Sequence, residues 1–254
     1  MTDQPPQPRP AATILLLRDQ PEMEVLMVKR HHQIDFASGA LVFPGGKTDA
    51  EDRNPDWAHQ SIGWDGLDPV QRELRVAAIR EVFEEAGILL ACHGDGRPYE
   101  GVCDPILRGA VDRRETTFLQ VVQDLDVKIS LDSLAVFARW ITPVMMPKRF
   151  DTFFYVVTAP ANQIAACDGH EAVDAEWVRP AEALRLSEAG ERTIIFPTRM
   201  NLGLLAEAHS TADAITRANQ RTLVTVLPEV TRQGGRNMLT IPADAGYGAV
   251  TEPI

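Results

Sequence analysis

The 254-residue sequence has few cysteines, few aromatic residues and no long apolar run. Its three cysteines, Cys92, Cys103 and Cys167, form no Cys-x-x-Cys pair, which argues against a zinc site and against a disulfide framework. We expect reduced thiols, as in a cytoplasmic protein. No apolar stretch reaches the roughly 18 residues that a membrane-spanning helix needs, and the N-terminus lacks the layout of a signal peptide. The sequence therefore predicts neither a membrane partner nor a zinc–cysteine centre.

Basic residues are also scarce, with 25 lysines and arginines against 36 aspartates and glutamates and a net charge of −11. A nucleic-acid-binding surface normally carries a basic patch, so this balance argues against a nucleic-acid partner. It does not exclude an anionic substrate, because a metal ion and a few local cations can outweigh the average charge. The 44% apolar and 24% charged composition is that of an ordinary globular chain with a sizeable core.

Two short stretches carry the strongest signal. The first is FPGG at positions 43–46, followed by Asp52, and the second is REVFEEAG at positions 80–87. Asp68-Pro69 is a strong helix start and Gly87 is a natural stop, so we expect a helix of about 18 residues between them. On that helix the three glutamates of the second stretch share one face, because they stand at i, i+3 and i+4.

Three carboxylates in one helical turn repel one another by about 0.2–0.5 kcal/mol per pair, and a bound divalent cation would reverse this cost. Hard oxygen ligands suit Mg²⁺ or Mn²⁺, which usually also hold water and substrate phosphate. A solvated acidic helix face is the alternative for an isolated Glu-x-x-Glu-Glu. The preceding arginine, the following glycine and the upstream FPGG favour a metal site.

Read together, the two stretches resemble the signature of the Nudix hydrolases: a glycine, an acid six residues later, then Arg-Glu-x-x-Glu-Glu-x-Gly and an aliphatic residue. Gly46, Asp52 and residues 80–88 match these positions. There are two departures: the first acid is Asp rather than Glu, and 27 residues separate it from Arg80 where the family usually has seven. The resemblance implies the α/β fold of the family, an α/β/α sandwich with a mixed sheet, together with Mg²⁺ (or Mn²⁺) dependence.

The resemblance also implies the metal ligands. Glu81 and Glu85 are expected to be the primary ones, and Asp52 and the backbone of Gly46 to complete the site. Glu84 is expected to complete the metal site as well and to take part in catalysis. Water held on such a metal has a lowered pKa, which prepares it to attack a phosphorus atom.

Several charged residues outside the glutamate cluster receive predicted roles. Arg80 is expected to orient the carboxylates by charge-assisted hydrogen bonds rather than to contact substrate. Arg149, Lys148 and Arg30 are candidates for binding substrate. The planar guanidinium fork of Arg149 suits phosphate oxygens. A surface arginine is an equally good interpretation of Arg149.

An acidic run precedes the strand expected at residues 173–178: Asp168, Glu171, Asp174 and Glu176. Nudix enzymes commonly draw one more acid from a loop in this region, as a metal ligand or as the catalytic base. Glu171 is our candidate for the base, because it lies in the loop rather than along the strand. A solvated acidic loop is the alternative.

The sequence predicts four segments: a flexible tail at 1–10, a Nudix hydrolase domain at 11–185, an insertion at 53–67 within it, and a C-terminal helical and hairpin extension at 186–254. In that extension, strands are expected at 222–227 and at 237–241. The insertion carries two tryptophans, which argue for an ordered lid or packed loop. Core packing is the favoured role for them, and a wall of the substrate pocket is the alternative.

Further stretches resemble the coenzyme A diphosphatase branch of the family: VFPGG at 42–46, ARWITP at 138–143 and RFDTFF at 149–154. The predicted function is metal-dependent hydrolysis of a diphosphate linkage in a small nucleoside diphosphate derivative, with coenzyme A and acyl-coenzyme A as candidates. An ADP-ribose or NADH pyrophosphatase is an alternative, and so is a ligand-sensing module that has kept the fold without turnover. The oligomeric state stays open, with a homodimer as one option.

Overall fold

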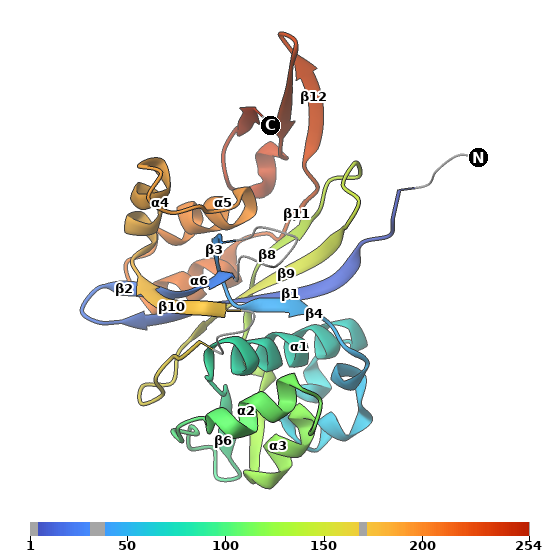
Figure 1. Cartoon of the computed structure of the whole chain (residues 1–254), viewed down its shortest axis with the longest axis vertical. Coiled ribbons are helices and arrows are strands. Elements are labelled where there is room, and N and C mark those ends of the chain that lie inside the picture. The colour runs from blue at the N-terminus through green and yellow to red at the C-terminus, as the bar shows by residue number, and fades with distance from the viewer. Residues whose placement is uncertain (1–4, 31–38, 168–171, 254) are drawn as a thin grey trace.

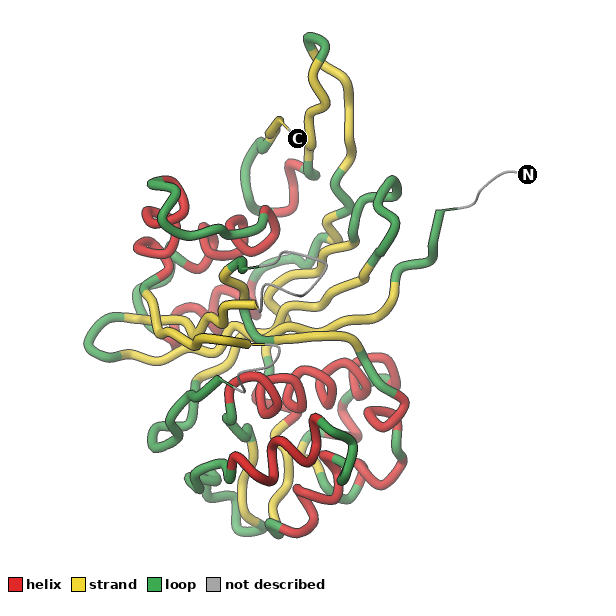
Figure 2. The backbone as a smooth tube through the Cα atoms, in the orientation of Figure 1, coloured by secondary structure: helices red, strands yellow, loops and turns green. Residues whose placement is uncertain are grey.

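The computed structural model describes residues 5–30, 39–167 and 172–253. A mixed β-sheet forms its centre, and helices cover both faces, which confirms the predicted α/β/α sandwich (Figure 1, Figure 2). None of the described helices is long and apolar enough to cross a membrane. The sheet order is β10 (Ala172–Val178), β2 (Met23–Arg30), β1 (Arg9–Asp19), β9 (Phe150–Thr158), β8 (Ala135–Ile141) and β11 (Thr225–Val226), with β3 (Leu41–Val42) paired to β2 and β4 (Gly45–Lys47) paired to β1.

The central strand β1 runs parallel to β9 and antiparallel to β2 and β4. Its aliphatic run is buried on both faces of the sheet, as expected for a strand between two layers. Ile14 and Leu16 face one hydrophobic cluster, whereas Leu15 and Leu17 face the other. The strand begins at Arg9, inside the predicted flexible tail, because the Arg9 amide donates to the Arg149 carbonyl at 2.9 Å.

The helix α1 (Pro69–Ala86) covers one face of the sheet with the limits that the sequence predicts. The Asp68 side chain caps its first turn, and Gly87 ends it in the left-handed region at φ 68°. Around α1 lie α2 (Pro105–Asp112), α3 (Phe118–Asp124) and a small sheet of β5 (Ser61–Ile62), β7 (Val127–Ser130) and β6 (Ala91–His93), as Figure 1 shows.

The opposite face of the sheet is covered by three later helices: α4 (Pro180–Glu188), α5 (Phe196–Leu205) and α6 (Thr211–Gln220). The predicted domain boundary at residue 185 therefore falls inside α4. A three-stranded hairpin sheet follows, made of β12 (Glu229–Gln233), β13 (Arg236–Thr240) and β14 (Thr251–Pro253). The strand predicted at 222–227 joins the main sheet as β11, whereas the strand predicted at 237–241 corresponds to β13 and pairs with β12.

The insertion is ordered and packs into the core. It contains two 3₁₀ helices, η2 (Pro55–Ala58) and η3 (Trp64–Gly66), and the strand β5. Trp57 is only 1% exposed and its ring lies 5.6 Å from that of Phe118, which confirms the predicted core packing for this tryptophan. Three further 3₁₀ helices are η1 (Ala50–Arg53), η4 (Leu131–Ser133) and η5 (Ala243–Ala245).

Candidate active site

The acidic face of α1 lies directly beneath β4, and two glycines make this contact possible. A Cβ atom on Gly46 would lie 2.5 Å from the carboxylate of Glu81, so any larger residue there would displace that carboxylate. Gly45 adopts φ +155°, and its amide donates to Oε2 of Glu85 at 3.0 Å. Both glutamates are buried. The two glycines belong to the short strand β4, which pairs with β1.

Arg80 is the centre of an ion-pair network among these acids. Its Nη1 donates to Glu81 Oε1 at 2.9 Å and to Glu84 Oε2 at 3.0 Å, and its Nη2 donates to the Lys47 carbonyl at 3.0 Å. Burial alone would lower the pKa of Arg80, but its hydrogen bonds with Asp52 and the neighbouring carboxylates raise it well above its ordinary value. The guanidinium is therefore charged and fixed in place.

Asp52 supports this arginine from the start of the insertion. Its Oδ1 accepts from Arg80 Nε at 2.9 Å, and its Oδ2 accepts from Arg80 Nη2 at 3.0 Å and from the Asp49 amide at 2.7 Å. The Asp49 contact is half of a capping box around η1, which explains why an aspartate stands here. The observed use of Asp52 is thus to hold Arg80, and its role as a metal ligand stays a prediction.

The donor chemistry of this cluster fits a hard divalent cation. Glu81, Glu84 and Glu85 present only carboxylate oxygens, the ligands that Mg²⁺ prefers. Burial raises the pKa of Glu84 despite the opposing charge of Arg80, and a cation would favour its ionised form. Within residues 5–30, 39–167 and 172–253, no three acidic, histidine or cysteine side chains already stand in a metal-holding arrangement. Arg80 now bonds to two of these carboxylates.

The segment between β9 and β10 is tied to the end of α1. The Ala166 amide donates to the Ala86 carbonyl at 2.9 Å, and Arg108 of α2 donates to the carbonyls of Ala166 at 2.5 Å and Cys167 at 2.7 Å. The buried Gln163 amide bonds to both backbone groups of Leu89. Sequence patterns did not indicate Arg108 or Gln163, because their partners are main-chain atoms more than 50 residues away.

A family model described as the NUDT19 Nudix domain matches residues 65–203, more than half of the chain. The chain belongs to the Nudix family. A general NUDIX domain model matches residues 7–122. The crystal structure of a NUDIX hydrolase from Alicyclobacillus acidocaldarius is 27% identical with a TM-score of 0.73, and the match covers 83% of this chain and 96% of that one. The family and fold implied by the signature are confirmed.

Two curated relatives are acyl-coenzyme A diphosphatases named NUDT19. The Xenopus laevis protein is 27% identical, and the match covers 64% of this chain and 54% of that protein. The Gallus gallus protein is 28% identical, and the match covers 85% of this chain and 72% of that protein. The Nudix chain thus spans only about half of the Xenopus laevis relative.

Arg149, one of the predicted substrate-binding residues of the Nudix domain, donates hydrogen bonds from its side chain to main-chain carbonyls. Arg149 is buried, and its guanidinium donates to the carbonyls of Thr142 at 3.0 Å and Pro6 at 2.9 Å. It fastens the N-terminal segment to the loop between β8 and β9. Lys148 is exposed in the same loop. The side chain of Arg30, at the end of β2, lies outside the described part of the chain.

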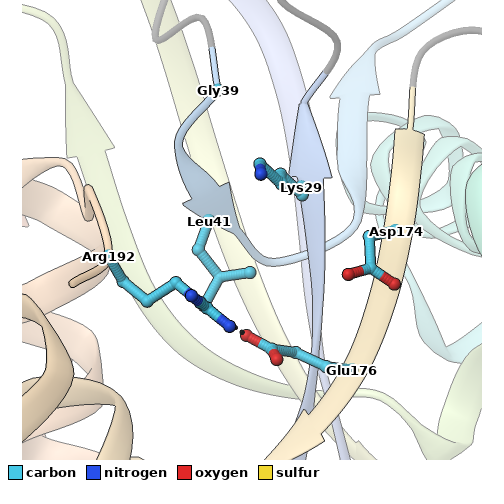
Figure 3. Close-up of a pocket in the computed structure, with 6 residues that line it drawn as sticks. All are labelled: Lys29, Gly39, Leu41, Asp174, Glu176 and Arg192. Carbon is cyan, nitrogen blue, oxygen red and sulfur yellow. Dashed lines mark hydrogen bonds and ion pairs between the residues drawn. The ribbon is translucent and has the colours of Figure 1, made fainter.

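Of the four residues in the predicted acidic run, Asp168 and Glu171 lie outside the described residues, and Asp174 and Glu176 lie within β10. Asp174 and Glu176 line a pocket of about 70 Å³ together with Lys29 and Arg192, and Arg192 pairs with Glu176 at 3.4 Å (Figure 3). The alternating residues of β10, Ala175 and Trp177, pack against the cluster that contains the Nudix helix α1. Asp174 and Glu176 therefore point to the opposite face of the sheet, away from the glutamate cluster.

Proposed function

We propose that this Nudix protein is a Mg²⁺- or Mn²⁺-dependent hydrolase that cleaves a diphosphate linkage in a nucleoside diphosphate derivative. The observation that carries the proposal is the burial of Glu81 and Glu85 against the Gly45-Gly46 backbone, beside Glu84. Family membership supports it. Buried carboxylates are costly unless a cation or hydrogen bonds compensate them, so their concentration here favours a chemical role over a surface one.

In the proposed site, the three glutamates hold the cation, which would neutralise phosphate charge and lower the pKa of a bound water. The chain's own residues provide the positioning. Arg80 fixes Glu81 and Glu84 through one nitrogen, and Asp52 holds Arg80 from the other side. The Gly45 amide fixes the Glu85 carboxylate. Glu171 is the proposed proton acceptor, on a segment that follows the anchored residues Ala166 and Cys167.

Coenzyme A or acyl-coenzyme A is the proposed substrate class. This proposal is supported by the activity for which the two NUDT19 relatives are named, acyl-coenzyme A diphosphatase, together with the stretches that resemble the coenzyme A diphosphatase branch. A panel of coenzyme A, acyl-coenzyme A, ADP-ribose and NADH, incubated with Mg²⁺ and followed by product analysis, tests this assignment. Release of a nucleoside monophosphate from ADP-ribose or NADH alone would replace the coenzyme A assignment.

The hydrolase itself is tested by Glu85→Gln and Glu81→Gln, which keep side-chain size and remove one charge. Mg²⁺-dependent turnover should fall at least about 100-fold, equivalent to about 2.7 kcal/mol of transition-state stabilisation. Glu182→Gln, on the exposed surface of α4, is the control and should keep its turnover. Near-normal turnover in both cluster variants would show that the carboxylates are a structural feature only.

The proposed base is tested separately by Glu171→Gln, which should lower kcat by roughly 10²–10⁴ with little change in Mg²⁺ affinity. Asp174→Asn is the matched control, because Asp174 belongs to the same acidic run and lines the pocket on the other face of the sheet. A larger loss in the Asp174 variant would overturn the choice of Glu171.

A further inference from the structure

A cavity of about 180 Å³ lies on the side of the sheet that faces away from α1. The end of α5, one side of α6, strand β8 and the turn at Gly246 surround it. Figure 1 shows α5 and α6 on this side of the sheet and α1 on the other. Phe137 of β8, which lines the cavity, packs in the hydrophobic cluster of α5 and α6, whereas the buried apolar residues of α1 pack in the other cluster. The cavity is therefore separate from the glutamate cluster.

The inside of this cavity is apolar, and its mouth is charged. Buried apolar side chains line the inside: Phe137, Leu205, Ala208 and Ala214. The exposed side chains of Glu207 and Arg217 stand at the mouth. Ala214, Arg217 and Arg221 stand at i, i+3 and i+7 along and just beyond α6, so they share one side of it, and the small alanine leaves the space open.

Arg221 lines the same cavity, and most of its hydrogen-bond donors are unused. Its Nη2 donates to the Phe137 carbonyl, and its guanidinium carbon lies 4.7 Å from the centroid of the Phe137 ring. A guanidinium has five N–H donors. Among the residues that the structure describes, none pairs a carboxylate with Arg221, and its Nε and Nη1 have no protein partner. Neither nitrogen is sealed off from solvent, so both are available to a ligand.

Other covered arginines of this chain are occupied by the protein. Arg108 and Arg149 each donate to two main-chain carbonyls. At Arg221, burial lowers the pKa of the guanidinium, and the interactions with Tyr247 and Glu207 oppose this shift without cancelling it. A half-buried charge without a counter-ion is costly. An anion in the cavity would remove that cost.

Arg217, the second cation of the cavity, already has acidic partners. Its Nε donates to Asp213 Oδ2 at 3.0 Å, and its Nη1 lies 3.7 Å from Glu207 Oε2. Arg221 therefore supplies a single uncompensated positive charge, which matches a monoanion better than a phosphate dianion. A carboxylate also suits a guanidinium, because its oxygens accept N–H bonds in the plane of that group.

The size and the lining of the cavity define the rest of the ligand. An apolar cavity of about 150 Å³ holds a molecule the size of benzene, so about 180 Å³ accommodates a carboxylate with a short chain. We propose that this cavity binds a small aliphatic carboxylate of about six carbon atoms, with its head group on Arg221 and its chain against Leu205 and Ala214. The site goes beyond the proposed hydrolysis and uses none of its residues.

Sodium hexanoate, acetate and hexan-1-ol are the probes, and backbone NMR titrations measure their dissociation constants without Mg²⁺ or nucleotide. Acetate has the charge without the chain, and hexan-1-ol has the chain without the charge. Wild type should bind hexanoate at least about tenfold more tightly than either, because only hexanoate gains both contributions. The signals of residues 137, 214, 217 and 246, which line the cavity, should shift on hexanoate addition.

Two variants test the role of charge in this binding. Arg221→Met keeps much of the aliphatic stem and removes the charge, so hexanoate should bind at least about tenfold more weakly, while hexan-1-ol binds as before. Glu207→Gln removes the acid at the mouth, so hexanoate should bind about two- to fivefold more tightly. Glu207 is exposed, and its substitution should leave the fold intact.

Arg18 provides a matched control. Its guanidinium also covers an aromatic ring, that of Trp177, at 4.3 Å, but it has a counter-ion in Glu24 at 2.7 Å. Arg18→Met should leave hexanoate binding unchanged. Glu85→Gln in the candidate active site should also leave it unchanged, because the sheet separates the two places.

The site is refuted if hexanoate shifts no signals of the cavity lining in wild type, or if it binds no more tightly than hexan-1-ol. An undiminished affinity in Arg221→Met, or an equal loss in Arg18→Met, refutes it as well. A loss in Glu85→Gln would place hexanoate at the glutamate cluster instead. If Arg221→Met does not fold, Glu207→Gln decides, and unchanged or weaker hexanoate binding in that variant overturns the proposal.

Discussion

Arg80 and Asp52 form a bidentate ion pair, with nitrogen–oxygen distances of 2.9 and 3.0 Å, although 27 residues separate them in the chain. The long spacer is tolerated because the entropic cost of closing a loop grows only slowly with its length. Each doubling of loop length costs only about 0.6 kcal/mol, so extending a seven-residue spacer to this length costs about 1 kcal/mol. Contacts of the insertion with the core can offset a cost of this size. The stretched signature therefore still assembles the network seen around Arg80.

Replacing Asp52 by Asn should lower the free energy of unfolding by about 1–3 kcal/mol, because Arg80 loses a charge-assisted pair in a buried position. The dissociation constant for Mg²⁺ should change little if Asp52 acts on Arg80 rather than on the cation. Urea denaturation and Mg²⁺ titration measure the two quantities, with the exposed neighbour Glu51→Gln as control. A large loss of Mg²⁺ affinity at unchanged stability would instead make Asp52 a ligand.

The two tryptophans of the insertion should respond differently to truncation. Trp57→Ala should destabilise the protein by about 3–5 kcal/mol, since it removes a fully buried ring that packs on Phe118. Trp64→Ala should cost clearly less, because its half-buried ring lies beside Arg72 near the surface. The denaturation midpoints of the two variants, each compared with that of the wild type, measure the two losses of stability. Similar small losses for both would mean that the insertion is not part of the core, and a changed KM in Trp64→Ala would favour the pocket-wall alternative.

Arg108 should act as a positioning residue for the segment that leads to the proposed base. Arg108→Met removes both hydrogen bonds to the Ala166 and Cys167 carbonyls, so kcat should fall by about tenfold or more, while KM and Mg²⁺ affinity stay near wild type. Arg113→Met, just after the end of the same helix, is the control, because that side chain pairs with Glu115 on the surface. Equal effects of the two substitutions on kcat would reject a positioning role for Arg108.

The ion pair between Arg53 of the insertion and Glu73 of α1 should make stability depend on pH below about 4.5. Burial opposes ionisation of Glu73, but hydrogen bonds from Arg53 and Thr48 lower its pKa below the ordinary 4.5. A carboxyl group with a lowered folded-state pKa stabilises the protein above its unfolded pKa, and the contribution is lost as the pH falls through the folded pKa. Glu73→Gln should thus be less stable than wild type at pH 7 by under about 1 kcal/mol.

That stability difference should shrink as the pH falls below 4.5 and vanish once the pH has passed the lowered pKa of Glu73 in the folded protein, because the wild-type carboxyl is then protonated as well. Thermal or urea unfolding at several pH values measures it. Arg53→Gln provides a second route to the same loss, and the double variant should lose little more than either single one. A difference that stays constant as the pH falls from about 7 to well below 4.5 would trace the effect of Glu73→Gln to packing rather than charge.

Local signals in the sequence were enough to place the Nudix helix. Asp68, Pro69 and Gly87 define both ends of α1, and each acts within a few residues of itself. β7 carries no comparable signal, because its partners β5 and β6 lie far away in the chain: Ile129 pairs with Ser61 and with Ala91. The strand at 229–233 was not predicted either. The stretch before it, at 222–227, is more apolar and was predicted to be a strand instead.

The candidate site likewise has some features that local sequence signals predict and others that depend on contacts between distant segments. The spacing of three glutamates on one helical face is a local property, and the structure places them together as expected. Which of them Arg80 would bind, and that Arg149 would be buried against the Pro6 carbonyl, depend on segments brought together by the sheet. A guanidinium has five donors and many possible acceptors, so its sequence position alone does not select among them.

The two-residue strand β11 has a consequence for any attempt to shorten the protein. It pairs with Arg139 and Trp140 of β8, which would otherwise be the last strand of the main sheet. A chain cut before β11 would leave the backbone N–H and C=O groups of β8 open along that border, ready to pair with the same strand of another molecule. The segment after α4 thus covers part of this edge, and a minimal Nudix fragment would be expected to self-associate more readily than the full chain.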